Sequence, residues 1–392
     1  MSESTRSIVD RARDGLEARI DDLSGRQTAG LVAGVVVLVG FVAAGLARPD
    51  SLAGELLDIA TSESAFGAAL RLSVPIALAA IGGIFAEKSG VINIGLEGHL
   101  IIAAFVAIWV TDVASGPPFE LGGLSILVGF VAGVFASTLL ALVFAVVCIE
   151  FRADQIIAGL AVWLIALGLA PFASQIVYGG PNTRSVGTVP TPPEMLGFLP
   201  TADQIPASFG VPVVGPLLGF VLDVLLTASL SVYLMIAMVA LSWYLLYRTA
   251  FGRWVRASGE NPSALDTAGV NVSRVRYAAV LLSGVFAGMG GSALSLGLGQ
   301  FTGNGPTMVN GKGFIAIVAY LFGNYNPVGA FLSTFLFAGL DALQLTLQTR
   351  GTGVPNSLVR IVPFVTVIIV LALVGRTRIP EAAGEHYESG EE

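Results

Sequence analysis

Residues 70–105 read LRLSVPIALAAIGGIFAEKSGVINIGLEGHLIIAAF, and this stretch decides the fold. Two apolar runs, 66–86 and 91–111, lie on either side of the charged pair Glu87 and Lys88. Each run is long enough to cross the hydrocarbon core of a bilayer as a helix. Glycines and polar side chains interrupt the second run near its start. The pattern therefore predicts membrane helices that carry polar groups into the membrane.

The composition of the whole chain points to the same class of protein. Of its 392 residues, 54% are hydrophobic and only 12% are charged, whereas a soluble domain carries about 25% charged residues. Its single cysteine, Cys148, excludes a secreted disulfide scaffold. The mean hydropathy of +0.81 excludes a disordered chain and an ordinary cytosolic enzyme. We therefore expect an all-α polytopic membrane protein.

Ten apolar segments are expected to cross the membrane as helices. They are 29–47, 66–86, 91–111, 121–149, 155–177, 223–247, 276–298, 311–324, 328–347 and 356–375. The segment 311–324 is short, so a brief span and a re-entrant segment are both open. Most Lys and Arg residues fall on one side of the membrane if all ten segments cross, which places the N- and C-termini in the cytoplasm.

This topology divides the chain into three parts. Residues 1–28 are expected to form a cytoplasmic N-terminal tail, because their mixed charge is unlike a cleaved signal peptide. Residues 29–375 form the transmembrane domain, and residues 376–392 form an acidic cytoplasmic tail.

The longest outside loop, 178–222, contains eight prolines, which we expect to exclude a regular helix there. It is either an ordered extracellular cap or a docking surface for an external partner.

A second polar stretch, 248–276, is expected on the cytoplasmic side and contains a short helix at 264–268. Asn261 and Pro262 favour its start, and Gly269 favours its end. A short helix between two spans is costly to order unless a partner docks on it, so this loop predicts a cytoplasmic partner.

Five polar or aromatic side chains within the apolar segments are candidates for a substrate path. They are Asn93, Glu97, His99, Trp163 and Asp341. A carboxylate inside the membrane costs about 2.5–3.5 kcal/mol when unpaired, so Glu97 is expected to face the interior of the helix bundle. Asn93 would share its face if the helix continued through both residues. The alternative is a polar cluster that locks neighbouring helices together, with Trp163 serving only in packing.

Small residues and missing motifs complete the sequence pattern. Gly284, Gly288 and Ser292 recur every four residues, which predicts close helix packing. There is no phosphate-binding loop of the G-x-x-x-x-G-K-[ST] type, no HExxH, no GxSxG and no CxxC motif. We therefore expect no catalytic residues, no metal site and no cofactor in this chain.

Three stretches resemble permease subunits of ABC importers, of the branched-chain amino acid, ribose and nucleoside type. They are 70–105, 151–172 and the cytoplasmic 259–291 with its continuation 311–330. The first of these is most similar to the nucleoside-uptake branch. The third resembles the ATPase-docking loop of such permeases, although Ser263 stands where the family has Glu and the final Pro of the motif is missing.

The resemblance implies a mechanism and a set of partners. A separate ABC ATPase that binds ATP and magnesium would dock on the cytoplasmic loop, at the six residues Glu260, Asn261, Pro262, Ala264, Asp266 and Gly269. A second, different permease subunit and an extracellular solute-binding lipoprotein would complete an importer in the cell membrane. It would take up nucleosides or simple sugars by alternating access, and nucleic acid is not an expected partner.

Two other functions remain open at this point. An ion-coupled secondary transporter of a small polar solute would use Glu97 and Asp341 for coupling. A membrane-embedded enzyme would need a cluster of titratable groups at one depth, and the sequence supplies few.

Overall fold

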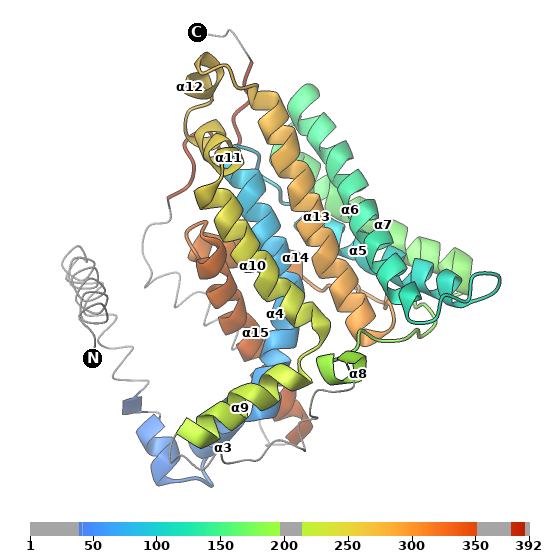
Figure 1. The fold of residues 1–392 in the computed structure, drawn as a ribbon, viewed down its shortest axis with the longest axis vertical. Coiled ribbons are helices and arrows are strands. Elements are labelled where there is room, and N and C mark those ends of the chain that lie inside the picture. Colours follow the sequence, from blue (N-terminus) through green and yellow to red (C-terminus); the bar gives the residue numbers. More distant parts are fainter. Residues whose placement is uncertain (1–38, 41, 197–213, 351–377, 389–392) are drawn as a thin grey trace. The chain divides into compact units, whose positions relative to one another are not determined.

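The structure of the protein, a computed structural model, describes residues 39–40, 42–196, 214–350 and 378–388 (Figure 1). It consists of two compact units. One contains residues 1–62 and 346–376, and its helix α3 (Leu52–Thr61) begins where the Ser51 hydroxyl accepts a hydrogen bond from Gly54 N–H. The other contains residues 63–345 and 377–392, and it holds every site discussed below.

The described residues of the larger unit are helices joined by loops, with one isolated β-bridge between Asn182 and Thr302. The first six helical elements in chain order are α4 (Glu63–Lys88), α5 (Leu96–Ser115), α6 (Leu124–Ala145), the π-helix η1 (Val146–Glu150), α7 (Gln155–Tyr178) and α8 (Pro192–Leu196). They are followed by α9 (Val214–Thr227), α10 (Leu230–Arg248), α11 (Ala250–Glu260), α12 (Pro262–Thr267), α13 (Val272–Leu298), α14 (Lys312–Phe322) and α15 (Pro327–Arg350).

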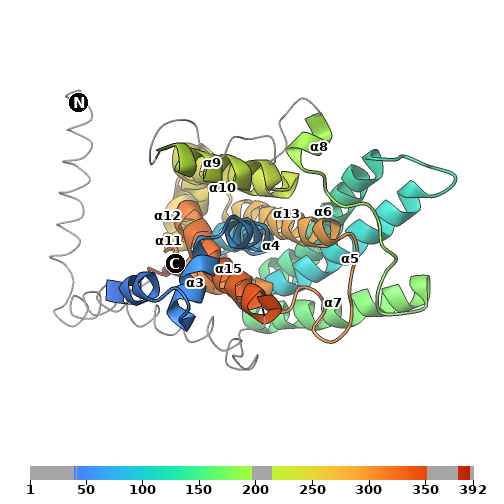
Figure 2. The same cartoon turned by 90° about the horizontal axis from the view of Figure 1, so that it is seen from below.

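Helix α4 is the central helix of this unit, with α10, α13 and α15 around it in the view of Figure 2. It is buried on all sides from Ser73 to Glu87, which its alanines and glycines allow. Helix α13 packs against α4, α5 and α6. A Cβ at Gly288 would lie 2.8 Å from the Cα of Val134 in α6, and one at Gly291 would lie 2.3 Å from the carbonyl oxygen of Leu100 in α5. The predicted packing role of the small-residue stripe is therefore confirmed.

Seven helices are long and apolar enough to cross a membrane within the described parts of the chain. They are Glu63–Lys88, Leu96–Ser115, Leu124–Glu150, Gln155–Tyr178, Leu230–Arg248, Val272–Leu298 and Pro327–Gln348. The predicted segments 29–47 and 356–375 fall mostly or wholly outside the described residues. Ten crossings, and the side on which the termini lie, remain predictions.

Two predicted segments differ from the observed helices by a late start or a break, a third forms only a short helix, and one helix was not predicted. The segment 91–111 becomes helical only at Leu96, so Asn93 precedes the helix and does not share a helical face with Glu97. The segment 223–247 is divided, because α9 ends at Thr227 and α10 starts at Leu230. The segment 311–324 forms an 11-residue helix, which at 1.5 Å per residue spans about half of a ~30 Å hydrocarbon core. Helix α11 was not predicted at all.

The prediction that proline excludes helix from 178–222 was wrong in part. Helix α8 begins with two prolines, and Pro216 lies in the first turn of α9. Proline is tolerated in a first helical turn, because the N–H groups of that turn have no partner within the helix.

Candidate functional site

A non-helical segment, 89–95, joins α4 to α5 inside the helix bundle. Gly90 adopts φ +97, a conformation that favours glycine. The side chains of two residues hold the segment: Gln155 Oε1 accepts from Ile92 N–H at 2.7 Å, and Asn93 Oδ1 accepts from Gly95 N–H at 3.0 Å. The Asn93 amide also donates to Ser283 Oγ in α13 at 3.1 Å. Broken backbone at membrane depth is tolerated where protein side chains satisfy it in this way.

The Glu97 carboxylate caps the first turn of α14. Its Oε1 accepts from Gly311 N–H at 2.7 Å and its Oε2 from Gly313 N–H at 2.6 Å, and the residue is only 2% exposed. A carboxylate is favoured at a helix N-terminus by the unpaired N–H groups and by the helix dipole. Glu97 therefore joins α5 to the start of α14, as expected if the polar residues hold neighbouring helices together.

Three of the five candidate path residues lie near the start of α14. Trp163 of α7 packs edge-on against Phe314 of α14, with ring centroids 5.3 Å apart. Lys312, at the first position of α14, interacts electrostatically with Asp341 of α15 and with Glu97. Its ammonium group donates to Val309 O at 3.2 Å. Glu97, Trp163 and Asp341 are thus brought together by one short helix.

His99 is fully buried in α5, and neither of its ring nitrogens has a hydrogen-bond partner among the described residues. The structure records no contact between His99 and the residues at the start of α14. Within the same described residues, no three His, Cys, Asp or Glu side chains are close enough to hold a metal ion.

A second buried carboxylate, Glu87, escaped the sequence analysis as a site. At the end of α4 it accepts hydrogen bonds from the phenols of Tyr320 and Tyr325, the latter at 2.7 Å. The ammonium of Lys88 lies 5.5 Å from the centroid of the Tyr325 ring. The sequence signal was present, since Glu87 adjoins an apolar run, but its partners are more than 230 residues away along the chain.

The predicted short cytoplasmic helix is present as α12. Asn261 Oδ1 accepts from Ala264 N–H at 2.9 Å, Pro262 occupies the first helical position, and Gly269 follows the helix with φ +80. The observed bounds, Pro262–Thr267, start two residues before the predicted ones. Glu260 ends the preceding helix α11, and Asp266 accepts a hydrogen bond from the Tyr387 phenol at 3.0 Å.

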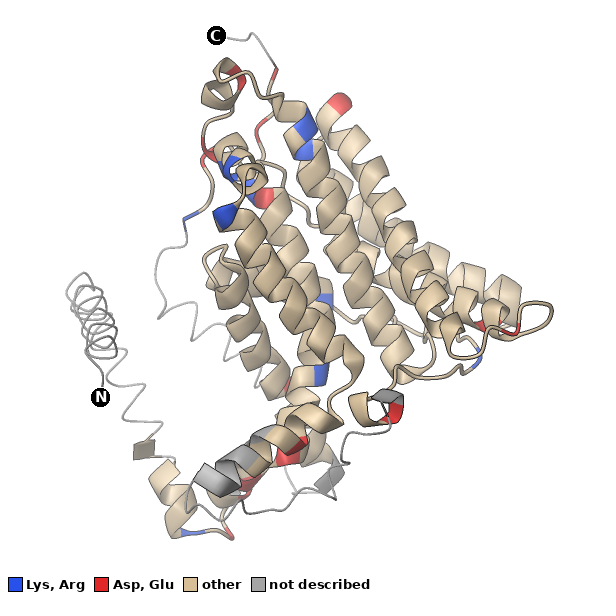
Figure 3. Ribbon diagram, in the orientation of Figure 1, with Lys and Arg blue, Asp and Glu red and all other residues tan. Residues whose placement is uncertain are grey.

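Helix α12 lies at one end of the larger unit together with other segments assigned to the cytoplasm. Ser258 Oγ donates to Ser89 O at 2.8 Å, and Ala382 N–H donates to Gly259 O at 2.8 Å. Basic residues gather on α11 and the start of α13 at this end (Figure 3). Segments assigned to the outside also meet one another, since Val186 N–H donates to Gly299 O at 2.7 Å. Loops that the topology prediction assigns to the same side of the membrane therefore contact one another in the structure.

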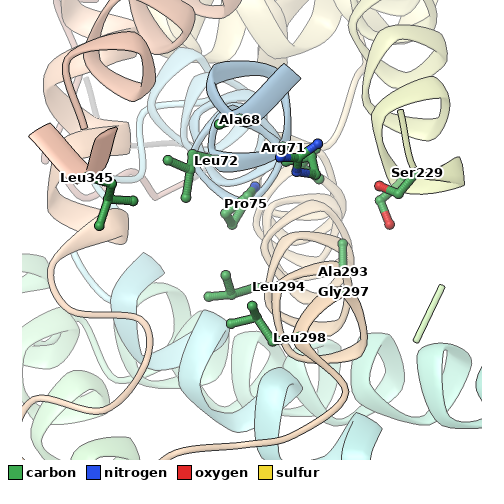
Figure 4. Close-up of a pocket in the computed structure, with 12 residues that line it drawn as sticks. Ala68, Arg71, Leu72, Pro75, Ser229, Ala293, Leu294, Gly297, Leu298 and Leu345 are labelled. Atoms are coloured by element: carbon green, nitrogen blue, oxygen red, sulfur yellow. The ribbon is translucent and has the colours of Figure 1, made fainter. Parts of the chain in front are cut away.

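A cavity of about 290 Å³ lies between α4, α10, α13 and α15. Its walls are mainly apolar, and Figure 4 shows Leu72, Pro75 and Leu294 among the side chains that line it. Three polar side chains also border it: Arg71 of α4, Ser229 at the start of α10 and Ser231 in its first turn. The sequence analysis did not place Arg71 in a site.

Comparison with known proteins identifies the relatives of this chain. Guanosine ABC transporter permease protein NupQ of Bacillus subtilis is 35% identical, over 82% of this chain and 96% of its own length. Nucleoside ABC transporter permease protein NupC of Lactococcus lactis is also 35% identical, over 81% of this chain and 94% of its own length. A glucose ABC transporter permease of Haloferax volcanii is 27% identical over 85% of this chain and 83% of its own length. No solved structure matches.

The family described as branched-chain amino acid transport system / permease component matches residues 66–371. This range includes the seven candidate membrane helices from α4 onward and the short helix α12, apart from the first residues of α4. The chain therefore belongs to this permease family and is a multi-pass protein of the cell membrane.

Proposed function

We propose that this chain is the translocation subunit of an ATP-driven importer that takes up nucleosides or simple sugars by alternating access. The observation that carries the proposal is α12, a capped six-residue helix with Ser263 and Ala264 exposed on it. So short a helix does not persist in water on its own strength. Its caps and its packing on α11 and α13 hold it ready for a partner.

An ABC ATPase is the partner that α12 would receive. The chain has no phosphate-binding loop of its own, so ATP and magnesium would bind on that separate subunit and this chain would carry no cofactor. Closure of the ATPases would move α12, and α11 would pass the movement to Ser89 through the Ser258 hydroxyl. Ser89 begins the non-helical segment 89–95, and Glu97, two residues after that segment, contacts the first turn of α14. We propose that the solute path runs beside this segment and the start of α14.

The remaining partners follow from the relatives. A second guanosine permease of Bacillus subtilis, NupP, is 24% identical to this chain, which supports pairing of two different permeases. An extracellular solute-binding lipoprotein would deliver the solute to the end of the unit where the 178–191 segment pairs with 299–303.

The competing function is an ion-coupled secondary transporter that uses Glu97 and Asp341. Both oxygens of Glu97 are engaged by the backbone of α14, and Asp341 interacts with Lys312. Glu97 is therefore not available to bind and release an ion without disturbing α14, and this favours the ATP-driven importer.

Reconstitution in liposomes distinguishes the two functions. We expect uptake of a nucleoside or sugar only when the ATPase, the second permease and the solute receptor are present with ATP. Uptake by this chain alone, driven by a proton or sodium gradient, would overturn the proposal. The variant Ala264→Pro should abolish ATPase binding while the permease remains folded in the membrane.

A further inference from the structure

Arg71 is an unpartnered charge in a membrane helix. Its side chain is exposed, and it makes no hydrogen bond or ion pair with any residue that the structure describes. A guanidinium within a span is costly unless water, a neighbouring acceptor or a ligand satisfies it. Ser229, on the facing helix, also has a hydroxyl without a capping hydrogen bond. Both groups border the same cavity (Figure 4).

The walls of this cavity determine which solute suits it. A monosaccharide presents hydroxyl groups in almost every direction, and each hydroxyl buried without a partner costs about 1–3 kcal/mol. The walls offered by Leu72, Pro75, Leu294 and Leu298 would leave most of these hydroxyls unpaired. A nucleobase has two apolar faces and a polar edge, so it fits leucine and proline walls with a guanidinium at one side. The cavity of about 290 Å³ is near the lower end of the usual range for ligand pockets.

We infer that this cavity is a subsite for the base of a nucleoside and that Arg71 binds the base at an edge that carries a carbonyl oxygen. A guanidinium has donors only, and it pairs in a bidentate manner with the O6 and N7 acceptors of guanine. Adenine presents an amino donor in place of O6, so the same edge would repel Arg71. The inference rests on the proposed import function and narrows it to nucleosides such as guanosine and inosine.

The test is a change of preference in the variant Arg71→Gln. Glutamine pairs with the N6 and N7 positions of adenine, so the variant should lose inosine and keep or gain adenosine. We expect the ratio of inosine to adenosine uptake, each as kcat/KM, to fall by about 10- to 100-fold. Because wild type and variant share one solute receptor, the preference of the receptor cancels from this comparison. Arg184→Gln, at an exposed arginine outside the cavity, is the matched control and should leave the ratio unchanged.

The outcomes separate this inference from the proposed function. An unchanged ratio in Arg71→Gln, or an equal loss for both nucleosides, would overturn the subsite and leave the importer standing. Failure of the complete wild-type complex to import any nucleoside or sugar would instead overturn the proposed function.

The described part of the C-terminal tail, 378–388, carries a second inference from different contacts. Ala382 N–H donates to Gly259 O at 2.8 Å, Gly384 N–H donates to Gly90 O at 3.0 Å, and the Arg276 guanidinium donates to Glu385 O at 2.7 Å. Pro380 and Ala382 are buried against this face. The phenol of Tyr387 then reaches Asp266 of α12 itself.

We propose that the ATPase docks on a composite surface made of α12 and this tail. The tail adjoins α12, so a partner that binds α12 also contacts the tail. Glu260, Glu381 and Glu385 are exposed on that surface. Basic groups of the ATPase that face these three carboxylates would make its binding weaken as the salt concentration rises. This inference also rests on the proposed function.

Binding of the purified ATPase to the full-length permease tests the composite surface. The double variant Glu381→Lys with Glu385→Lys should weaken binding by about tenfold at low salt and remove most of its salt dependence. Tyr387→Phe, which removes only the hydroxyl that reaches α12, should weaken binding by a few-fold. Glu120→Lys, a charge reversal at an exposed glutamate of the loop between α5 and α6, is the control and should change nothing.

The comparison variant is Ala264→Pro. If it abolishes binding while the tail variants bind normally, the composite surface is wrong and docking on α12 remains. If none of these variants alters binding, the docking proposal itself fails.

Discussion

Glu97 is a buried carboxylate whose two oxygens complete the first turn of another helix. At the scale of the residue, it replaces the hydrogen bonds that Gly311 and Gly313 would otherwise lack inside the membrane. The sequence predicted that Glu97 faces the protein interior, because an unpaired carboxylate is unstable in lipid. It did not predict the partners, which lie more than 210 residues further along the chain.

Replacing Glu97 by Ala should lower the free energy of unfolding by about 2–4 kcal/mol, because two buried N–H groups lose a charged acceptor. Thermal unfolding in detergent measures the change. Glu55→Ala, at an exposed glutamate of α3, should cost less than about 1 kcal/mol. Equal stabilities for Glu97→Ala and wild type would show that the capping contact is not formed.

The pair of phenols on Glu87 gives a second expectation at this scale. Tyr325→Phe removes one of the two donors that the buried carboxylate accepts, so stability should fall by about 1–3 kcal/mol. Tyr244→Phe is the matched control, since Tyr244 is 55% exposed on α10. A Tyr325→Phe protein as stable as the control would contradict the assignment of Glu87 as a buried acceptor.

At the scale of the element, features set by neighbouring residues could be predicted from the sequence, and features set by contacts between distant segments could not. Asn261, Pro262 and Gly269 act on neighbouring backbone groups, so their spacing was enough to predict α12. The interruption near 89–95 was visible in its glycines and polar residues, but not how it is held, because Gln155 and Ser283 come from other helices. Helix α11 was hidden by its polar composition, since the search for spans looked for apolar runs.

Gly269→Ala should destabilise the end of α12 by roughly 1–2 kcal/mol, because φ +80 disfavours any side chain. We expect weaker ATPase binding as a result, measured with purified subunits. Gly122 is a suitable control: it also has positive φ and open space around it, in the loop between α5 and α6. Gly122→Ala should strain its own loop equally and leave ATPase affinity unchanged.

The contact between α13 and α6 gives another expectation for an element. Gly288→Ala places a methyl group 2.8 Å from a backbone atom of α6, so the two helices must separate and stability should fall by about 1–3 kcal/mol. Gly168 lies within α7 with no atom near its added methyl group. Gly168→Ala should therefore be neutral or stabilising, by up to about 1 kcal/mol. A similar response of both variants in thermal unfolding would refute the close approach.

At the scale of the whole molecule, the all-helical membrane class followed from composition and apolar run length. The grouping of loops at the two ends of the larger unit agrees with the charge asymmetry that predicted the topology. The cavity beside Arg71 was beyond the sequence, because four helices from distant parts of the chain enclose it. Composition could not place these helices side by side.

The central claim is that an ATPase grips this permease from the cell interior at α12. Thiol labelling tests it most directly: Ser263→Cys, on the exposed face of α12, is made in a Cys148→Ser background and treated with a membrane-impermeant reagent. The account predicts labelling in inside-out vesicles and none in intact cells, with protection when the ATPase is bound. Labelling of Ser263→Cys in intact cells would place α12 outside the cell and contradict the account.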